Sequence, residues 1–242
     1  MSAVPILAFE EIDSTNAEAR RRAEAGEAGP MWITALRQTA GRGRRGRNWE
    51  TGEGRNLAAT YLFVTDRKPA EAAQISFVAA LAAADLAAAF VPPPLVSLKW
   101  PNDLLIAGRK SAGILVESGA IGGRLWVAVG MGVNLAEAPD IPERPATTFA
   151  AHMRAPPPPP LAALDVLAPA LERWRGLWER SGFPAIAAAW TERAHGLGEA
   201  CTAHLPGETI SGVAEGLDVD GALRLRTPDG HVRRITAGDV FF

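Results

Sequence analysis

The chain has 242 residues, which is long for one average domain and short for two. Hydrophobic residues make up 48% and charged residues 21%, a composition that excludes global disorder. The formal net charge is −2, so a nucleic-acid site would have to be a local patch. One cysteine, Cys201, excludes an internal disulfide and favours a reducing compartment. With no secretory signal at the start of the sequence, we expect a cytoplasmic protein.

The first half of the sequence alternates strands and helices around one long loop. Short apolar and β-branched runs indicate strands, and an Ala-rich stretch that ends at three prolines indicates a buried helix rather than a membrane span. In chain order we expect a strand at 6–9, a helix at 17–24, a strand at 31–36, a loop at 39–56, a strand at 57–64, a helix at 70–90, a strand at 96–100, a hairpin of 104–106 with 112–117, and a strand at 125–133.

The second half changes character twice. We interpret the proline run at 156–160 as a stiff loop that leads into helices rather than as a linker between domains. After Gly198, short alternating segments are separated by Pro-Gly and Asp-Gly turns, a pattern typical of a small β-barrel-like unit. We expect helices at 161–180 and 184–194, followed by strands at 201–205, 209–217, 222–226 and 231–235.

The densest chemical signal is the segment Gly41–Arg47, GRGRRGR, called here the Gly-Arg loop. It matches the glycine pattern of a dinucleotide-binding turn, but that turn must open a helix, and residues 48–52 are a loop. Arginine forks bind phosphate or carboxylate, and glycines let the backbone fold tightly over a ligand. We expect this loop to be mobile until an anion orders it. A solvated basic loop or a contact with RNA are the alternatives.

Three further segments carry candidate site residues. The turn Lys99–Asp103 follows a strand, where polar groups often border a cleft, although it also fits a simple surface turn. Lys110 lies beside the hairpin turn and, taken alone, fits a charge at a hairpin tip. Gly130 and Gly132 interrupt a strand, which indicates a bulge or a ligand pressed against the backbone.

The histidines do not suggest a nucleophile–base arrangement or a metal site, because all four lie far from these motifs in the sequence: His152, His195, His204 and His231. Several positive groups and one carboxylate around an anion remain. That set favours electrostatic phosphoryl or adenylyl chemistry.

Taken in order, these segments resemble the biotin protein ligases. The resemblance rests on DSTN at 13–16, QTAGRGRRGRNW at 38–49, KWPND at 99–103, RK at 109–110 with AGILVE at 112–117, and GMGVN at 130–134. Ser111 departs from it, because the family usually has an apolar residue there. The resemblance implies an α+β fold, with a mixed-sheet ligase-like catalytic domain at 1–196 and a small SH3-like β-barrel at 197–242.

The resemblance also implies a two-step reaction and a role for each site residue. Biotin and ATP, with Mg²⁺, give biotinyl-5′-AMP, and biotin then passes to one lysine of a biotin carboxyl carrier protein. Ser14, Thr15, Asn16 and Gln38 would surround biotin; Arg42, Gly43 and Arg44 would close over the adenylate; Lys110 would contact the biotin carboxylate and the α-phosphate; Asp103 would receive the acceptor lysine; and Trp49 and Asn134 would line the adenylate side.

Two other readings stay open. A lipoate or octanoyl ligase of the same superfamily would share the architecture. An RNA-binding module could use the Gly-Arg loop, although the net charge of −2 and the aromatic content of 7% disfavour it. Some relatives carry an N-terminal repressor domain, and because the DSTN motif begins at residue 13 we expect no repressor function, no DNA and no membrane as partners. The resemblance allows a homodimer.

Overall fold

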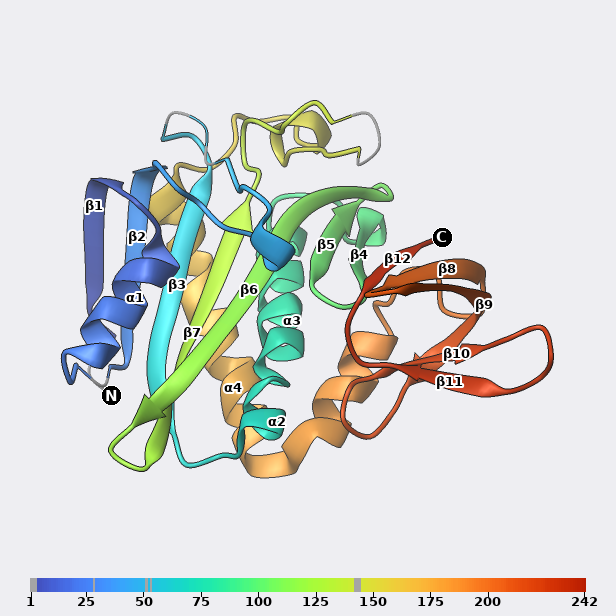
Figure 1. Cartoon of the computed structure of the whole chain (residues 1–242). Coiled ribbons are helices and arrows are strands. Elements are labelled where there is room, and N and C mark those ends of the chain that lie inside the picture. The colour runs from blue at the N-terminus through green and yellow to red at the C-terminus, as the bar shows by residue number, and fades with distance from the viewer. Residues whose placement is uncertain (1–3, 28, 51, 53, 142–144) are drawn as a thin grey trace.

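The computed structural model describes residues 4–27, 29–50, 52, 54–141 and 145–242. Within them, seven strands form one mixed sheet in the order β1-β2-β3-β7-β6-β5-β4 (Figure 1). Strand β1 pairs parallel to β2, and the other neighbours pair antiparallel. The strands are β1 (Ile6–Ile12), β2 (Met31–Gln38), β3 (Leu57–Thr65), β4 (Val96–Lys99), β5 (Asp103–Ile106), β6 (Arg109–Ile121) and β7 (Arg124–Val133).

Helices cover the two faces of this sheet unequally. α3 (Ile75–Ala88) and α4 (Pro160–Thr191) pack together over one face, where a large apolar core includes Leu81, Trp178 and Trp190. The short α1 (Thr15–Glu24) covers only part of the other face, through Ala19 and Ala23. Figure 1 shows α1 beside β2 and β3, with α3 and α4 behind the sheet. The face of β6 and β7 beyond α1 is therefore left for the functional site.

One helix prediction needs correction and another is confirmed. The expected helix at 70–90 is divided into α2 (Pro69–Ala72) and α3, because residues 73–74 make a turn between them. The two helices expected at 161–180 and 184–194 are confirmed as the two parts of α4, which are separated by a kink at Gly182, where φ is 70°. Glycine adopts that backbone geometry without the steric cost that other residues have.

Among the residues that the structure describes, one stretch, Pro69–Ala88, is long and apolar enough to cross a membrane by length and composition. An 18-residue window of it has a mean hydropathy of 1.3, and 67% of that window is buried inside the fold. That burial is typical of a core helix, which is how the sequence was interpreted.

After α4 the chain forms a five-stranded antiparallel sheet in the order β11-β10-β9-β8-β12. Its strands are β8 (Ala200–Leu205), β9 (Glu208–Leu217), β10 (Leu223–Arg226), β11 (Val232–Ile235) and β12 (Asp239–Phe241). The sequence missed β12, a three-residue strand that pairs with β8. The α+β fold with a separate C-terminal sheet is confirmed, whereas the boundary at 196/197 stays a prediction.

Candidate active site

A cavity of about 720 Å³ opens on the sheet face beside α1. Its walls come from the start of α1, the Gly-Arg loop, the 99–103 turn, β6, β7 and β12. All eleven residues that the sequence singled out for the site line it: Ser14, Thr15, Asn16, Gln38, Arg42, Gly43, Arg44, Trp49, Asp103, Lys110 and Asn134. Segments far apart in the chain therefore meet at one place, and the individual roles stay predictions.

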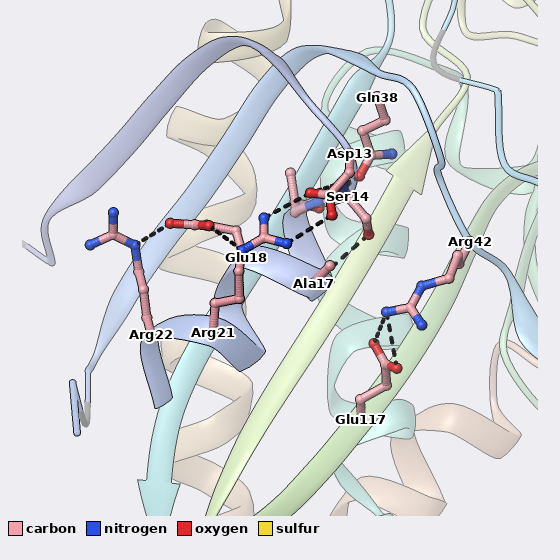
Figure 2. Close-up of polar contacts among 10 residues, drawn as sticks. Asp13, Ser14, Ala17, Glu18, Arg21, Arg22, Gln38, Arg42 and Glu117 are labelled. Carbon is pink, nitrogen blue, oxygen red and sulfur yellow. Dashed lines mark hydrogen bonds and ion pairs between the residues drawn. The ribbon is translucent and has the colours of Figure 1, made fainter. Parts of the chain in front are cut away.

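The start of α1 is fixed firmly at one end of the cavity. The side chain of Ser14 caps the helix by accepting a hydrogen bond from the Ala17 N–H, and Asp13 receives two bonds from the Arg21 guanidinium at 2.7 and 2.8 Å (Figure 2). The Arg21 bonds hold the pKa of Asp13 down at about 2. The backbone N–H of Thr15 donates to Gln38 Oε1 at 2.8 Å. A rigid polar wall results.

Behind that wall lies a second set of polar contacts. Thr60 on β3 is fully buried, and its hydroxyl lies 2.8 Å from Thr15 Oγ1 and 2.7 Å from Asn16 Oδ1. Asn16 Nδ2 donates to the Leu115 carbonyl and to Glu117 on β6. Neither Thr60 nor Glu117 lines the cavity.

In another part of the cavity, an aromatic ring packs over glycines. A Cβ added to Gly132 would lie 2.2 Å from the Trp49 indole, and one added to Gly113 would lie 3.1 Å from it. The two glycines thus let the ring approach the sheet. Trp49 Nε1 and Asn134 Oδ1 are buried there and have no hydrogen-bond partner among the described residues. Buried polar atoms of this kind are costly unless a ligand or water pairs with them.

The cavity also contains an ion pair. Lys110 Nζ lies 2.5 Å from Asp103 Oδ1, and it is 5.8 Å from the centre of the Trp49 ring. Lys110 is on β6 rather than at the tip of the hairpin, so its charge points into the cavity. An anion bound here would meet this ammonium group.

Carboxylates hold the Gly-Arg loop at both ends. Arg42 pairs with Glu117 at 3.3 Å, as Figure 2 shows, and at the far end Arg45 and Arg47 both pair with Asp239 on β12. Burial opposes ionisation of Asp239, but the bond from Arg47 and the charges of the arginines outweigh it and lower its pKa. The C-terminal sheet therefore helps to position the loop.

Arg44 lies between these anchors and points inward. Its Nη1 donates to Asn102 Oδ1 at 3.1 Å. Burial lowers the pKa of Arg44, an effect that the nearby charges of Asp239 and Asp103 oppose. Because arginine titrates far above neutral pH, the group keeps its charge and can face an anion.

The chain matches two family models. The model of the biotin/lipoate A/B protein ligase family matches residues 8–134, and that of the biotin protein ligase C-terminal domain matches residues 196–242. The chain is 45% identical to the biotin–[acetyl-CoA-carboxylase] ligase of Paracoccus denitrificans, over 95% of this chain and 97% of that protein. It is 33% identical to the enzyme of the same name from Mycobacterium tuberculosis, over 94% and 85%.

The chain belongs to the biotin/lipoate A/B protein ligase family. Its fold also resembles a biotin protein ligase from Aquifex aeolicus solved with biotin and ATP, with a TM-score of 0.78 over 98% of this chain and 97% of that one. The sequence identity of that pair is 24%, so this comparison shows the fold alone.

Sequence reasoning missed three residues of this ligase site and set aside a fourth. Glu117 stood inside a quoted motif without a role, and nothing in the sequence singled out Thr60 or Asp239. His195 was dismissed because it is distant in the sequence, yet it lines the cavity and packs edge-on against Phe242 at 5.5 Å. The docking of the C-terminal sheet brings Asp239 to the site, whereas His195 is held beside β4 by its backbone N–H, which donates to the Leu98 carbonyl at 2.7 Å.

Proposed function

We propose that the chain activates biotin with ATP and transfers it to a lysine of a biotin carboxyl carrier domain. The observation that carries this proposal is one cavity that brings three chemistries together: a polar wall at Thr15 and Gln38, the cations Lys110 and Arg44, and the stacking surface of Trp49. A small polar ring, a carboxylate beside a phosphate, and a purine would occupy these places.

The first step brings two anions together. A carboxylate oxygen of biotin attacks the α-phosphorus of ATP, a new P–O bond forms, and pyrophosphate leaves with the electrons of the bond that breaks. Lys110 and Arg44 offset the repulsion between the reacting groups, and their fixed positions supply much of the remaining rate. Trp49 and Asn134 would hold the base, using the indole face and the unpaired amide oxygen.

The second step needs a neutral amine. The lysine of the carrier attacks the acyl carbon of biotinyl-AMP, an amide bond forms, and AMP leaves. Asp103 lies at the cavity beside Lys110, where a carboxylate can accept the proton that the amine loses. Lys110 would stabilise the charge on the departing phosphate.

Magnesium would arrive with the triphosphate. The described residues contain no group of three or more His, Cys, Asp or Glu side chains suited to holding a metal ion. The carboxylates that line the cavity are Glu50, Asp103 and Asp239. Mg²⁺ usually binds through one or two carboxylates, substrate phosphates and water, and this donor set fits that mode. When bound, the ion would neutralise phosphate charge.

The test is a defined reaction. Purified chain is incubated with biotin, ATP, Mg²⁺ and a biotin carboxyl carrier domain, and the intact mass of the carrier is measured. We expect a gain of one biotinyl group that requires ATP and disappears when the acceptor lysine becomes arginine. Lipoic and octanoic acids are offered in parallel. Modification of the carrier by either acid in preference to biotin would contradict the proposal and favour the lipoate-type alternative.

The cellular setting follows from the same chemistry. The partner is a carrier domain of a biotin-dependent carboxylase, and the single cysteine and the use of ATP support a cytoplasmic location. A homodimer and the absence of DNA binding remain predictions from the resemblance.

A further inference from the structure

The polar contacts behind the cavity wall form one continuous line of hydrogen-bonding groups. It runs from Thr15, which lines the cavity, through Thr60 and Asn16 to Glu117. The hydroxyls of Thr15 and Thr60 each carry only one hydrogen to donate. Counting those protons fixes the direction of every bond in the line.

Glu117 fixes the first direction. A carboxylate accepts only, so Asn16 must turn its Nδ2 toward Glu117, at 2.8 Å, and toward the Leu115 carbonyl, at 3.2 Å. A flipped amide would set its oxygen against both acceptors. Asn16 Oδ1 therefore faces Thr60 and sits in space that only a glycine at 130 leaves, because a Cβ there would lie 2.3 Å from this oxygen.

The next bonds follow from that orientation. Asn16 Oδ1 can only accept, so the Thr60 hydroxyl donates to it across 2.7 Å. With its proton committed, Thr60 must accept from the Thr15 hydroxyl across 2.8 Å. The opposite order would leave the 2.7 Å contact between two acceptor oxygens with no proton between them.

Thr15 then has no proton left for its other neighbour. Its Oγ1 lies 3.1 Å from Gln38 Oε1, which already accepts the Thr15 backbone N–H. Two lone-pair-bearing oxygens thus stand side by side at the wall of the cavity. A donor from the ligand relieves their repulsion.

We propose that Glu117 and Thr60 are positioning residues that fix Thr15 as a hydrogen-bond acceptor, so that the cavity selects a ligand with an N–H donor at this wall. This inference rests on the proposed function, since the ureido ring of biotin carries two such N–H groups. Glu117 also pairs with Arg42 of the Gly-Arg loop at 3.3 Å.

The main variants change Thr60. Thr60→Val keeps the shape and removes the hydroxyl, so the Thr15 proton is free to point toward Gln38 or into the cavity, and Thr15 is no longer fixed as an acceptor. We expect the KM for biotin to rise about 10- to 100-fold while the KM for ATP stays near the wild-type value. Thr60→Ser should restore the KM for biotin. Thr34→Val is the matched control, because Thr34 is a buried threonine of β2 whose hydroxyl bonds the Ala58 carbonyl.

A second measurement uses the unmodified chain and tests donor preference directly. Two biotin analogues each carry a ring oxygen in place of one ureido N–H. At least one should bind the wild type about 10- to 100-fold more weakly than biotin. Thr60→Val should remove most of that difference, since the Thr15 hydroxyl is then able to donate to the analogue.

Several outcomes would overturn the inference. An unchanged KM for biotin in folded Thr60→Val, an equal loss in Thr34→Val, or tight binding of both analogues by the wild type would each do so. Failure of the wild type to bind biotin or to release pyrophosphate with it would instead overturn the proposed function.

Discussion

Lys110 and Asp103 reach the cavity from the neighbouring strands β6 and β5, and their 2.5 Å contact makes each the immediate environment of the other. Lys110→Ala should therefore slow adenylation without unfolding the chain. Loss of a contact of this kind typically costs about 2–4 kcal/mol at the transition state, or roughly 10² to 10³ in rate. Pyrophosphate release measures the step. Arg109→Ala, a change at the exposed neighbour, is the control, and a folded Lys110→Ala that released pyrophosphate at the wild-type rate would remove Lys110 from the mechanism.

Asp103→Asn should separate the two steps of the reaction. If Asp103 accepts the proton of the incoming lysine, transfer from purified biotinyl-AMP should slow by about 10²-fold or more, and adenylation should slow less. Purified adenylate with carrier reports the second step, and pyrophosphate release reports the first. Equal losses in both would mean that Asp103 acts only by holding Lys110.

Ser111 differs from the paired Lys110 and Asp103, because its polar atom has no partner among the described residues. Its side chain is fully buried next to Lys110, and its Oγ makes no hydrogen bond among the described residues. An unpaired buried hydroxyl is costly, so Ser111→Ala should raise the free energy of unfolding by about 1 kcal/mol. Thermal unfolding should then shift upward by roughly 2–4 °C. A lower melting temperature would show that the hydroxyl has a partner in solution.

Among the elements, the Gly-Arg loop depends most on charge. Its own backbone bonds include Gly43 N–H to Arg47 carbonyl at 2.7 Å and Trp49 N–H to Gly41 carbonyl at 2.9 Å, and the outer anchors are ion pairs. Ordering such a segment costs about 1–2 kcal/mol per residue, which an anion would help to offset. We expect amide exchange of residues 41–47 to slow when biotin and ATP are added. Exchange that did not change would count against an ordering transition.

Arg44→Gly should weaken this closure. Arg44 is the arginine of the loop that turns inward, so its loss should lower the affinity for biotin and release reactive biotinyl-AMP. Released adenylate would label exposed lysines of an added unrelated protein, which a biotin probe detects. A variant that bound biotin as tightly as the wild type and labelled no bystander would show that the loop is not a lid.

The elements also show what a sequence reveals and what it does not. Strands such as β3 and β7 were predictable because a run of apolar residues indicates a buried segment. The eleven cavity residues were predictable because they lie in short contiguous motifs. The division between α2 and α3 depends on a two-residue turn that carries no glycine or proline. Partners such as Glu117 and Thr60 depend on the register of β3, β7 and β6, which the hydrophobic pattern does not give.

Across the whole molecule, Asp239 connects the C-terminal sheet to the Gly-Arg loop. Its pKa lies below the ordinary value, so the pairing with Arg45 and Arg47 is present at neutral pH and is lost only as the pH falls through that lowered pKa. Asp239→Asn should make biotinyl-AMP dissociate about 2- to 5-fold faster, as expected for partly exposed ion pairs. Single-turnover release measures the rate. A rate that stayed at the wild-type value in low salt would show that the sheet does not hold the loop.

The indole of Trp100 donates to the Gly221 carbonyl at 3.0 Å, and a Cβ on Gly221 would lie 2.7 Å from the Phe77 ring. The turn between β9 and β10 is thus inserted among side chains of the larger sheet's core, although separate family models match the two regions. An exchange of C-terminal regions between relatives would therefore fail unless the residues equivalent to Phe77 and Trp100 were exchanged too. Over evolutionary time, a substitution at this contact in one region should be accompanied by a matching substitution in the other.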